Sequence, residues 1–337
     1  MRERASRRNI GAMSQEIFTK DHLRRFLTQR WADRGVTITE NERIGVSIEE
    51  LVAYSMERNS KQEMPYVDLW VAVLDESISW LISLYLVIYG DKKPGRLSAL
   101  ERATTIIVGK LIADSLAIRH LIFAGFDNSA QPVLRSVSEY MEVLVAILHA
   151  PAFAGPFVAA DTPEAAQQFW EQYLRSGKIR RRVTAAWNDF MKSANDPAAQ
   201  WFANWGRSSL PILSGISHPS YGGAVHASIP GKVKYENDYW LGVWGDRSDN
   251  SANTVYTYLQ YLFPVLLLSS KFPFDGYGAH IQRTYDETNE LHRHVQIGRD
   301  VIASLIFSLG TETNKSHVFP EIDMSIWPDD SSDEKTE

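Results

Sequence analysis

The stretch that most constrains the fold is residues 127–150, DNSAQPVLRSVSEYMEVLVAILHA. At 100° per residue its apolar side chains recur with the helical period, which predicts a helix of about six turns. In the second half the opposite side is apolar too, whereas further up that side carries Arg135, Glu139 and Glu142. A helix that is apolar all round is buried on every side. The stretch therefore predicts the central helix of a bundle, with a polar patch at its upper end.

Helical periodicity covers most of the remaining chain. Two long helices are predicted before the central one, at 67–89 and 97–126, and the short connections between the three favour antiparallel neighbours. The sequence therefore predicts an all-α, multi-helix bundle. Further helices are predicted at 21–34, 47–58, 163–176, 178–191, 200–217, 250–270 and 275–309.

One segment departs from the helical pattern. The runs VHASI, VKY and YWLGVW are separated by the turn-forming PG and END. Short runs rich in β-branched and aromatic residues between turn residues are typical of strands. We therefore expect a small β-hairpin insertion at about 222–247.

Three parts are predicted along the chain. Residues 1–60 form an N-terminal extension with one or two short helices, and residues 61–310 form the helical core. Residues 311–337 form an acidic tail that we expect to be disordered. Residues 321–337 hold seven acids and one Lys (1 − 7 = −6), which equals the net charge of the whole chain, so the rest is near neutral.

Composition excludes several classes of chemistry. The chain has no cysteine, so it has no disulfide and no thiolate site, which fits a cytoplasmic protein. Its apolar runs of about 12 and 16 residues fall short of the ~20 that a membrane span needs. Neither a P-loop nor a Gly-x-Ser-x-Gly, His-Glu-x-x-His or Glu-x-x-His motif occurs. We therefore expect no cofactor, no metal and no membrane span.

Two features of the central bundle could carry a site. Arg135 and Glu139 are spaced as an i,i+4 ion pair, which is either a surface pair or a cleft-facing pair beside Ser136. Asp114 lies on the apolar stripe of the preceding helix, and a buried carboxylate needs a partner. Arg135, His120 or a backbone donor could serve, and the resulting pair is either structural or part of a ligand site.

A second candidate lies in SGISHPSYGG, residues 214–223. His218 ends a predicted helix, where the dipole favours its charged form. It is either a general acid/base or a histidine that caps the turn. We take Ser214, Ser217 and Tyr221 as candidate ligand-binding residues around it.

A third candidate is a basic run on the 178–191 helix and just before it. Such a run is either a solvated face or a surface for a phosphate backbone. The run consists of Arg175, Lys178, Arg180, Arg181 and Arg182, of which we take Arg175, Lys178, Arg181 and Arg182 as candidate nucleic-acid contacts.

Residues 67–310 resemble an uncharacterised group of all-helical bacterial proteins found beside defence and mobile-element genes. The resemblance rests on Leu134-Arg135-Ser136-x-x-Glu139 and on Ser214/Ser217 with His218-Pro219. The group is distantly similar to HEPN-type helical domains, many of which are dimeric ribonucleases with Arg-x(4–6)-His on one helix. Here Arg207 precedes His218 by eleven positions, so no catalytic residue is carried over from them.

Three functional hypotheses remain open. The first is a defence-type, metal-independent ribonuclease acting at a cleft of Arg135, Glu139 and His218, with RNA as substrate and a homodimer implied by the resemblance. There His218 would move the proton, Arg135 would stabilise the phosphorane and Glu139 would orient Arg135. The second is a module that binds an anion or nucleotide without turnover, and the third is a helical interaction protein.

Overall fold

The computed structural model describes residues 20–35, 48–61, 63–89, 97–191, 247, 249–269 and 289–315. The chain forms two compact units, Met1–Tyr54 and Ser55–Glu337. The predicted helix at 200–217, the predicted hairpin apart from Arg247, and the acidic tail beyond residue 315 lie outside the described residues.

The first unit contains α2 (Lys20–Ala32) and the start of α3 (Ile48–Lys61), which continues into the second unit. After α2 the chain turns through Gly35, whose φ of 77° is a left-handed conformation that glycine adopts without strain. The aromatic residues of α2 are exposed: Phe26 by 54% and Trp31 by 39%.

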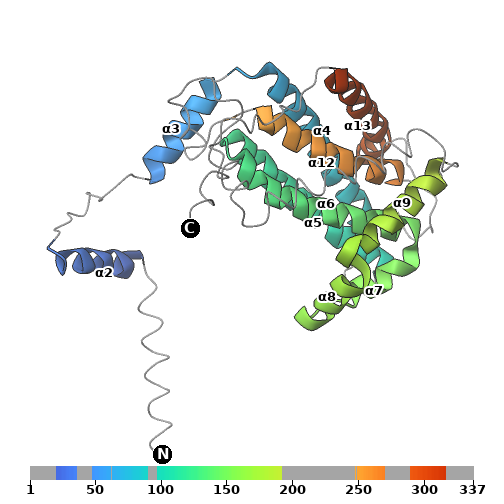
Figure 1. Cartoon of the computed structure of the whole chain (residues 1–337), viewed down its shortest axis with the longest axis horizontal. Helices are drawn as coiled ribbons and strands as arrows, with labels where there is room; N and C mark the ends of the chain where they lie inside the picture. The colour runs from blue at the N-terminus through green and yellow to red at the C-terminus, as the bar shows by residue number, and fades with distance from the viewer. Residues whose placement is uncertain are drawn as a thin grey trace, which may run out of the picture. The chain divides into compact units, whose positions relative to one another are not determined.

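The core of the second unit is built from α4 (Pro65–Tyr89), α5 (Ala99–Phe123), α6 (Asp127–His149), α12 (Asp249–Leu267) and α13 (Glu290–Lys315). Helix α5 packs on both α4 and α6, while α12 contacts α4, α6 and α13, and α13 packs along α4 (Figure 1). The described residues contain no strand, which confirms the all-α prediction for this part of the chain.

Local signals in the sequence define the ends of α5. Ser98 caps it: its hydroxyl accepts from the Glu101 N–H at 3.2 Å, and the Glu101 carboxylate accepts from the Ser98 N–H at 2.8 Å. This capping box satisfies two amide groups that would otherwise lack helical partners. At the other end Gly125, with φ 75°, reverses the chain directly into α6.

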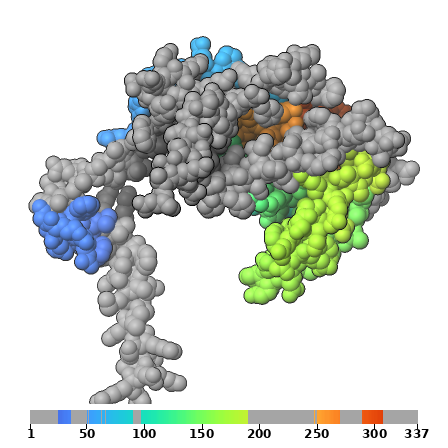
Figure 2. Space-filling model, viewed as in Figure 1, coloured from blue at the N-terminus to red at the C-terminus, as the bar shows by residue number. Residues whose placement is uncertain are grey.

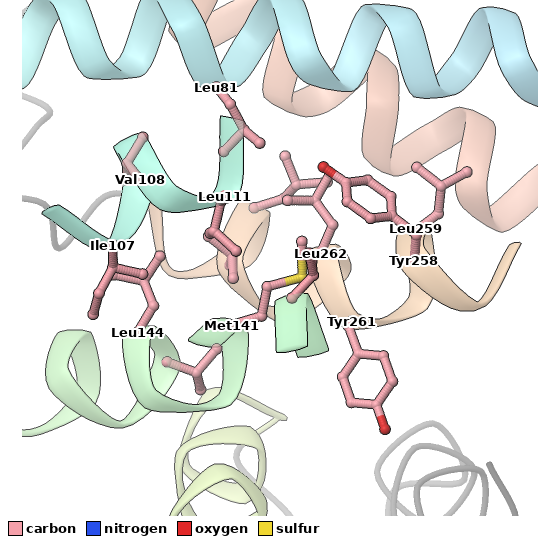
Figure 3. Packing of buried hydrophobic residues seen from close by; sticks show 14 of the residues in the cluster. Leu81, Ile107, Val108, Leu111, Met141, Leu144, Tyr258, Leu259, Tyr261 and Leu262 are labelled. Carbon is pink, nitrogen blue, oxygen red and sulfur yellow. The ribbon is translucent and has the colours of Figure 1, made fainter. Parts of the chain in front are cut away.

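Helix α6 is the centre of the bundle, as the sequence predicts. Every residue from Met141 to Leu148 is buried, because α5, α9 (Lys178–Met191) and α12 pack around it. Met141 and Leu262 meet near Leu111 in the middle of the core (Figure 3). Burying each such side chain stabilises the fold by about 1.5–3 kcal/mol.

A layer of short helices follows α6. The chain passes through η2 (Pro151–Phe153), α7 (Ala154–Val158) and α8 (Pro163–Phe169), then a π-helical turn η3 (Trp170–Leu174) and η4 (Arg175–Gly177) before α9. Thr162 caps α8 by accepting from the Ala165 N–H at 3.2 Å. An aromatic cluster with ring centroids 5.1–5.8 Å apart holds the layer together: Phe153, Phe157, Phe169 and Tyr173.

One described segment, Val67–Tyr89, is long and apolar enough to cross a membrane by length and composition alone. Of its most apolar window, 61% is buried inside the bundle.

Candidate functional site

The pair predicted on α6 is present. The Arg135 Nε lies 3.4 Å from the Glu139 Oε1, which confirms the i,i+4 ion pair. The Arg135 side chain is 28% exposed and the Glu139 side chain 46%, so the pair is half-buried. Ser136, beside Arg135, is also half-buried.

The partner of Asp114 differs from those expected. Its carboxylate pairs with the ammonium of Lys110, one turn earlier on α5, at 2.5 Å, and not with Arg135 or His120. The Lys110 ammonium also lies 5.6 Å from the centre of the Tyr140 ring on α6. A cation on the same helix can pair with Asp114 however the neighbouring helices are rotated. The expected pairing of Asp114 with Arg135 or His120 was therefore wrong.

Two turns below Arg135, Glu142 of α6 makes a buried ion pair. The Arg180 guanidinium of α9 donates to the Glu142 Oε1 from Nη2 at 2.9 Å and from Nε at 3.2 Å. Its Nη2 also lies 3.3 Å from the Tyr261 hydroxyl of α12. The three residues therefore join α6, α9 and α12 through one polar contact inside an apolar core.

Electrostatics at this contact are dominated by burial. Burial raises the pKa of Glu142 above its ordinary value of 4.5, the Arg180 guanidinium opposes that rise, and the nearby Glu139 carboxylate adds to it. The four side chains form a row with charges +, −, −, + in the order Arg135, Glu139, Glu142, Arg180. The Arg135–Glu139 end of this row is more open to solvent than the Glu142–Arg180 end.

The predicted basic residues lie together on η4 and α9. Arg175 is exposed, with its guanidinium 5.8 Å from the ring centre of Trp170, which is itself 42% exposed. Arg182 is exposed and lies over Phe153 at 4.8 Å, and Arg181 is exposed beside it. We call this set the basic–aromatic surface: Trp170, Arg175, Lys178, Arg181 and Arg182. Helices α8 and α9 form a continuous yellow-green surface in Figure 2.

Other predicted residues cannot be placed. His218, Ser214, Ser217 and Tyr221 lie outside the described residues, so the convergence of His218 with Arg135 stays a prediction. Arg180 belongs to the predicted basic run, but its pairing with Glu142 was not predicted, although the sequence contains a signal for it. Glu142 is the member of the polar patch nearest to the half of the helix that is apolar all round, and a buried carboxylate needs a cation.

A separate pair of ion pairs connects other parts of the bundle. Arg119 of α5 pairs with Asp75 of α4, and Arg247 pairs with Asp68 of α4. Both guanidinium groups lie over the Phe123 ring, at 4.5 and 5.4 Å from its centre. These contacts link α4, α5 and the segment before α12, and we assign them to folding.

Within the described ranges, no three acidic or histidine side chains are grouped so that they could hold a metal ion. No model of a known protein family matches this sequence, and no curated protein or solved structure matches it.

Proposed function

We propose that this chain binds single-stranded nucleic acid, with RNA as the favoured polymer, through the basic–aromatic surface. The observation that carries the proposal is an exposed Trp170 ring set among exposed arginines on one short stretch of chain. Proteins that bind single strands combine cations that contact phosphates with aromatic rings on which bases stack.

The charge of this surface favours a polyanion. Residues 170–182 contain five bases and one acid (5 − 1 = +4), and one of the five, Arg180, is engaged by Glu142 inside the core. The first turn of α9 has no acidic residue, so its cations are repelled by the helix dipole there. Within the protein, Lys178 donates to the Glu171 carbonyl at 2.8 Å and Arg180 pairs with Glu142. An external anion near the exposed Arg181 and Arg182 would relieve the remaining repulsion.

The aromatic part of the surface favours a single strand. The Trp170 ring is 42% exposed and begins the π-helical turn η3, a distortion that is common at functional sites. Bases of a single strand can stack on such a ring, whereas those of a duplex are already stacked on each other. RNA is favoured because the sequence resembles a group related to ribonucleases.

Binding can be measured by fluorescence anisotropy with a labelled 20-nucleotide RNA, its DNA equivalent and the RNA duplex. We expect the single strands to bind more tightly than the duplex. Trp170→Ala should weaken binding about tenfold, since stacking contributes about 1–3 kcal/mol per base. Trp31→Ala is the matched control, because Trp31 is 39% exposed but lies on α2. Equal losses from both substitutions, or no binding by the wild type, would overturn the proposal.

A finer proposal is that the bound RNA is also cut, with Arg135 at the reacting phosphate. It is supported by the half-exposed Arg135–Glu139 pair, which presents an oriented guanidinium at the open end of the charged row. In this proposal His218 transfers the proton and no metal takes part.

Incubating the protein with labelled RNA, with and without a chelator, tests cleavage separately from binding. We expect chelator-resistant cleavage that Arg135→Ala and His218→Ala each abolish while leaving RNA affinity within about twofold. Binding without cleavage would reject the ribonuclease and retain the nucleic-acid-binding protein.

A further inference from the structure

Helices α4 and α13 bring together a serine, a histidine and a glutamate from distant parts of the sequence. The Ser83 Oγ lies 2.8 Å from the His294 Nδ1, and the His294 Nε2 lies 3.3 Å from the Glu76 Oε1. Ser83 and Glu76 are two turns apart on α4, so both face the imidazole that α13 presents.

We propose that Ser83, His294 and Glu76 form a second site, which hydrolyses carboxylic esters with Ser83 as the nucleophile. The proposal is independent of nucleic-acid binding. A serine within about 2.6–3.2 Å of an imidazole, whose other nitrogen is held by a carboxylate, is the arrangement that activates a serine hydroxyl. The ring nitrogens exchange roles relative to the best-known hydrolases, but either nitrogen can accept the proton.

The hydroxyl of Ser83 contacts a neighbouring helix, as those of Ser55 and Ser251 do, but its partner is an imidazole and theirs are oxygens. The hydroxyls of Ser77, Ser115 and Ser138 donate to backbone carbonyls three or four residues earlier on their own helices. That is the usual partner of a serine inside a helix. Ser83 contacts the imidazole of another helix, 211 positions away in sequence, so its proton can pass to a base.

The position of His294 is fixed by its surroundings. The Trp80 indole N–H donates to the Val295 carbonyl at 2.9 Å, which holds α13 against α4. Gly298, one turn after His294, allows the close approach, since a Cβ there would lie 3.2 Å from Trp80 and 3.5 Å from the imidazole. A fixed imidazole loses little orientational freedom in the reaction.

The cluster opens to solvent beside three exposed apolar side chains. The His294 side chain is 29% exposed and that of Glu76 48%, while Ser83 lies beneath them with 6% exposed. One turn from His294 on either side, Ile297 is 52% exposed and Leu291 37%, and Leu86 beside Ser83 is 44% exposed. These neighbours favour an ester with an apolar acyl chain.

The reaction balances with water as the only co-reactant. The Ser83 oxygen bonds to the carbonyl carbon and its proton moves to His294, which then protonates the leaving alkoxide as the ester C–O bond breaks. Water attacks the acyl-serine, gives its proton to His294, and releases the acid as the proton returns to Ser83. Glu76 orients the imidazole and is a positioning residue, whereas Ser83 and His294 are catalytic.

The test uses the full chain with p-nitrophenyl butyrate and, separately, a fluorophosphonate probe read by mass spectrometry. We expect an initial burst of about one p-nitrophenolate per chain, as an acyl-enzyme mechanism requires. We also expect a probe adduct on Ser83 in folded but not in heat-denatured protein. His294→Gln should lower kcat at least about 100-fold, as expected for loss of a general base. Ser83→Ala should lower it at least as much, because no acyl-serine can form. Glu76→Gln should lower kcat about tenfold at unchanged KM, with Glu76→Asp restoring part of it.

Ser79→Ala is the matched control, because Ser79 is exposed one turn before Ser83 on α4, and it should leave the rate unchanged. The probe reads the wild-type protein, so the test does not depend on whether any variant folds. No adduct on Ser83 in folded protein, or an ester rate that Ser83→Ala leaves unchanged, would overturn the proposal.

Discussion

At the scale of single residues, charge in the core is tolerated where a second helix supplies the counter-ion. Glu142 and Arg180 are both largely buried, with side chains 8% and 19% exposed. Arg135 and Glu139 make the same kind of pair with more solvent around it. Comparing the two pairs separates the effect of burial on stability from the effect of charge.

Removing the cation from each pair should give different losses of stability. Arg180→Ala leaves the Glu142 carboxylate buried without its cation and should lower the free energy of unfolding by about 3 kcal/mol. Arg135→Ala removes half of a solvent-screened pair and should cost below about 1 kcal/mol. Urea denaturation of both variants measures the losses, and equal losses would refute this account of the two sites.

The raised pKa of Glu142 makes its contribution to stability depend on pH. A carboxyl whose pKa is higher in the folded than in the unfolded state stabilises the fold at low pH and loses that contribution as pH rises through the folded pKa. The unfolding free energy of wild type minus that of Glu142→Gln should therefore fall as pH rises from below 4.5. A difference that rises with pH would show that Arg180, and not burial, dominates at this carboxyl.

At the scale of helices, α4 and α13 pack closely because one residue lacks a side chain. A Cβ on Gly298 would lie 3.2 Å from Trp80, which is fully buried and held by its hydrogen bond to Val295. A Cβ on Gly109 of α5 would lie 3.4 Å from the half-buried Tyr85 ring, an ordinary contact. Close packing therefore requires a glycine at position 298, whereas position 109 has room for a Cβ.

Alanine substitutions test this difference. Gly298→Ala should lower the free energy of unfolding by about 1 kcal/mol or more, because the clash exceeds the gain of about 1 kcal/mol in helix propensity. Gly109→Ala should be neutral or stabilising by up to about 1 kcal/mol. Thermal melts monitored by circular dichroism compare them, and a Gly298→Ala variant as stable as wild type would mean that Trp80 can move.

The helices themselves could be predicted because each reflects a local apolar period. The predicted ranges 127–150 and 178–191 became Asp127–His149 and Lys178–Met191. Contacts between helices could not be predicted, because they depend on how each helix is rotated and shifted against its neighbours. Arg180 is 38 positions from Glu142, and His294 is 211 from Ser83. Asp114 differs from these pairs, since its partner Lys110 lies one turn away on the same helix and the i,i+4 spacing is visible in the sequence.

At the scale of the whole molecule, charge is unevenly placed. The net charge of −6 equals the contribution of residues 321–337 alone, so the other residues sum to zero. The +4 of residues 170–182 is therefore a local excess and not part of a generally basic protein. Residues 1–34 are a second basic stretch, with nine bases and four acids (9 − 4 = +5). We expect a polyanion to bind at residues 170–182 because there an exposed Trp170 lies among exposed arginines.

Salt dependence of single-stranded RNA binding tests that claim most directly. For single strands the logarithm of the binding constant falls with the logarithm of salt concentration by about 0.7 for each phosphate contact. Replacing Arg175, Arg181 and Arg182 by Gln should therefore reduce the slope by about two. The control replaces three exposed arginines elsewhere, Arg34, Arg102 and Arg293, and should leave the slope unchanged. Equal slopes for the two triple variants would contradict nucleic-acid binding at the basic–aromatic surface.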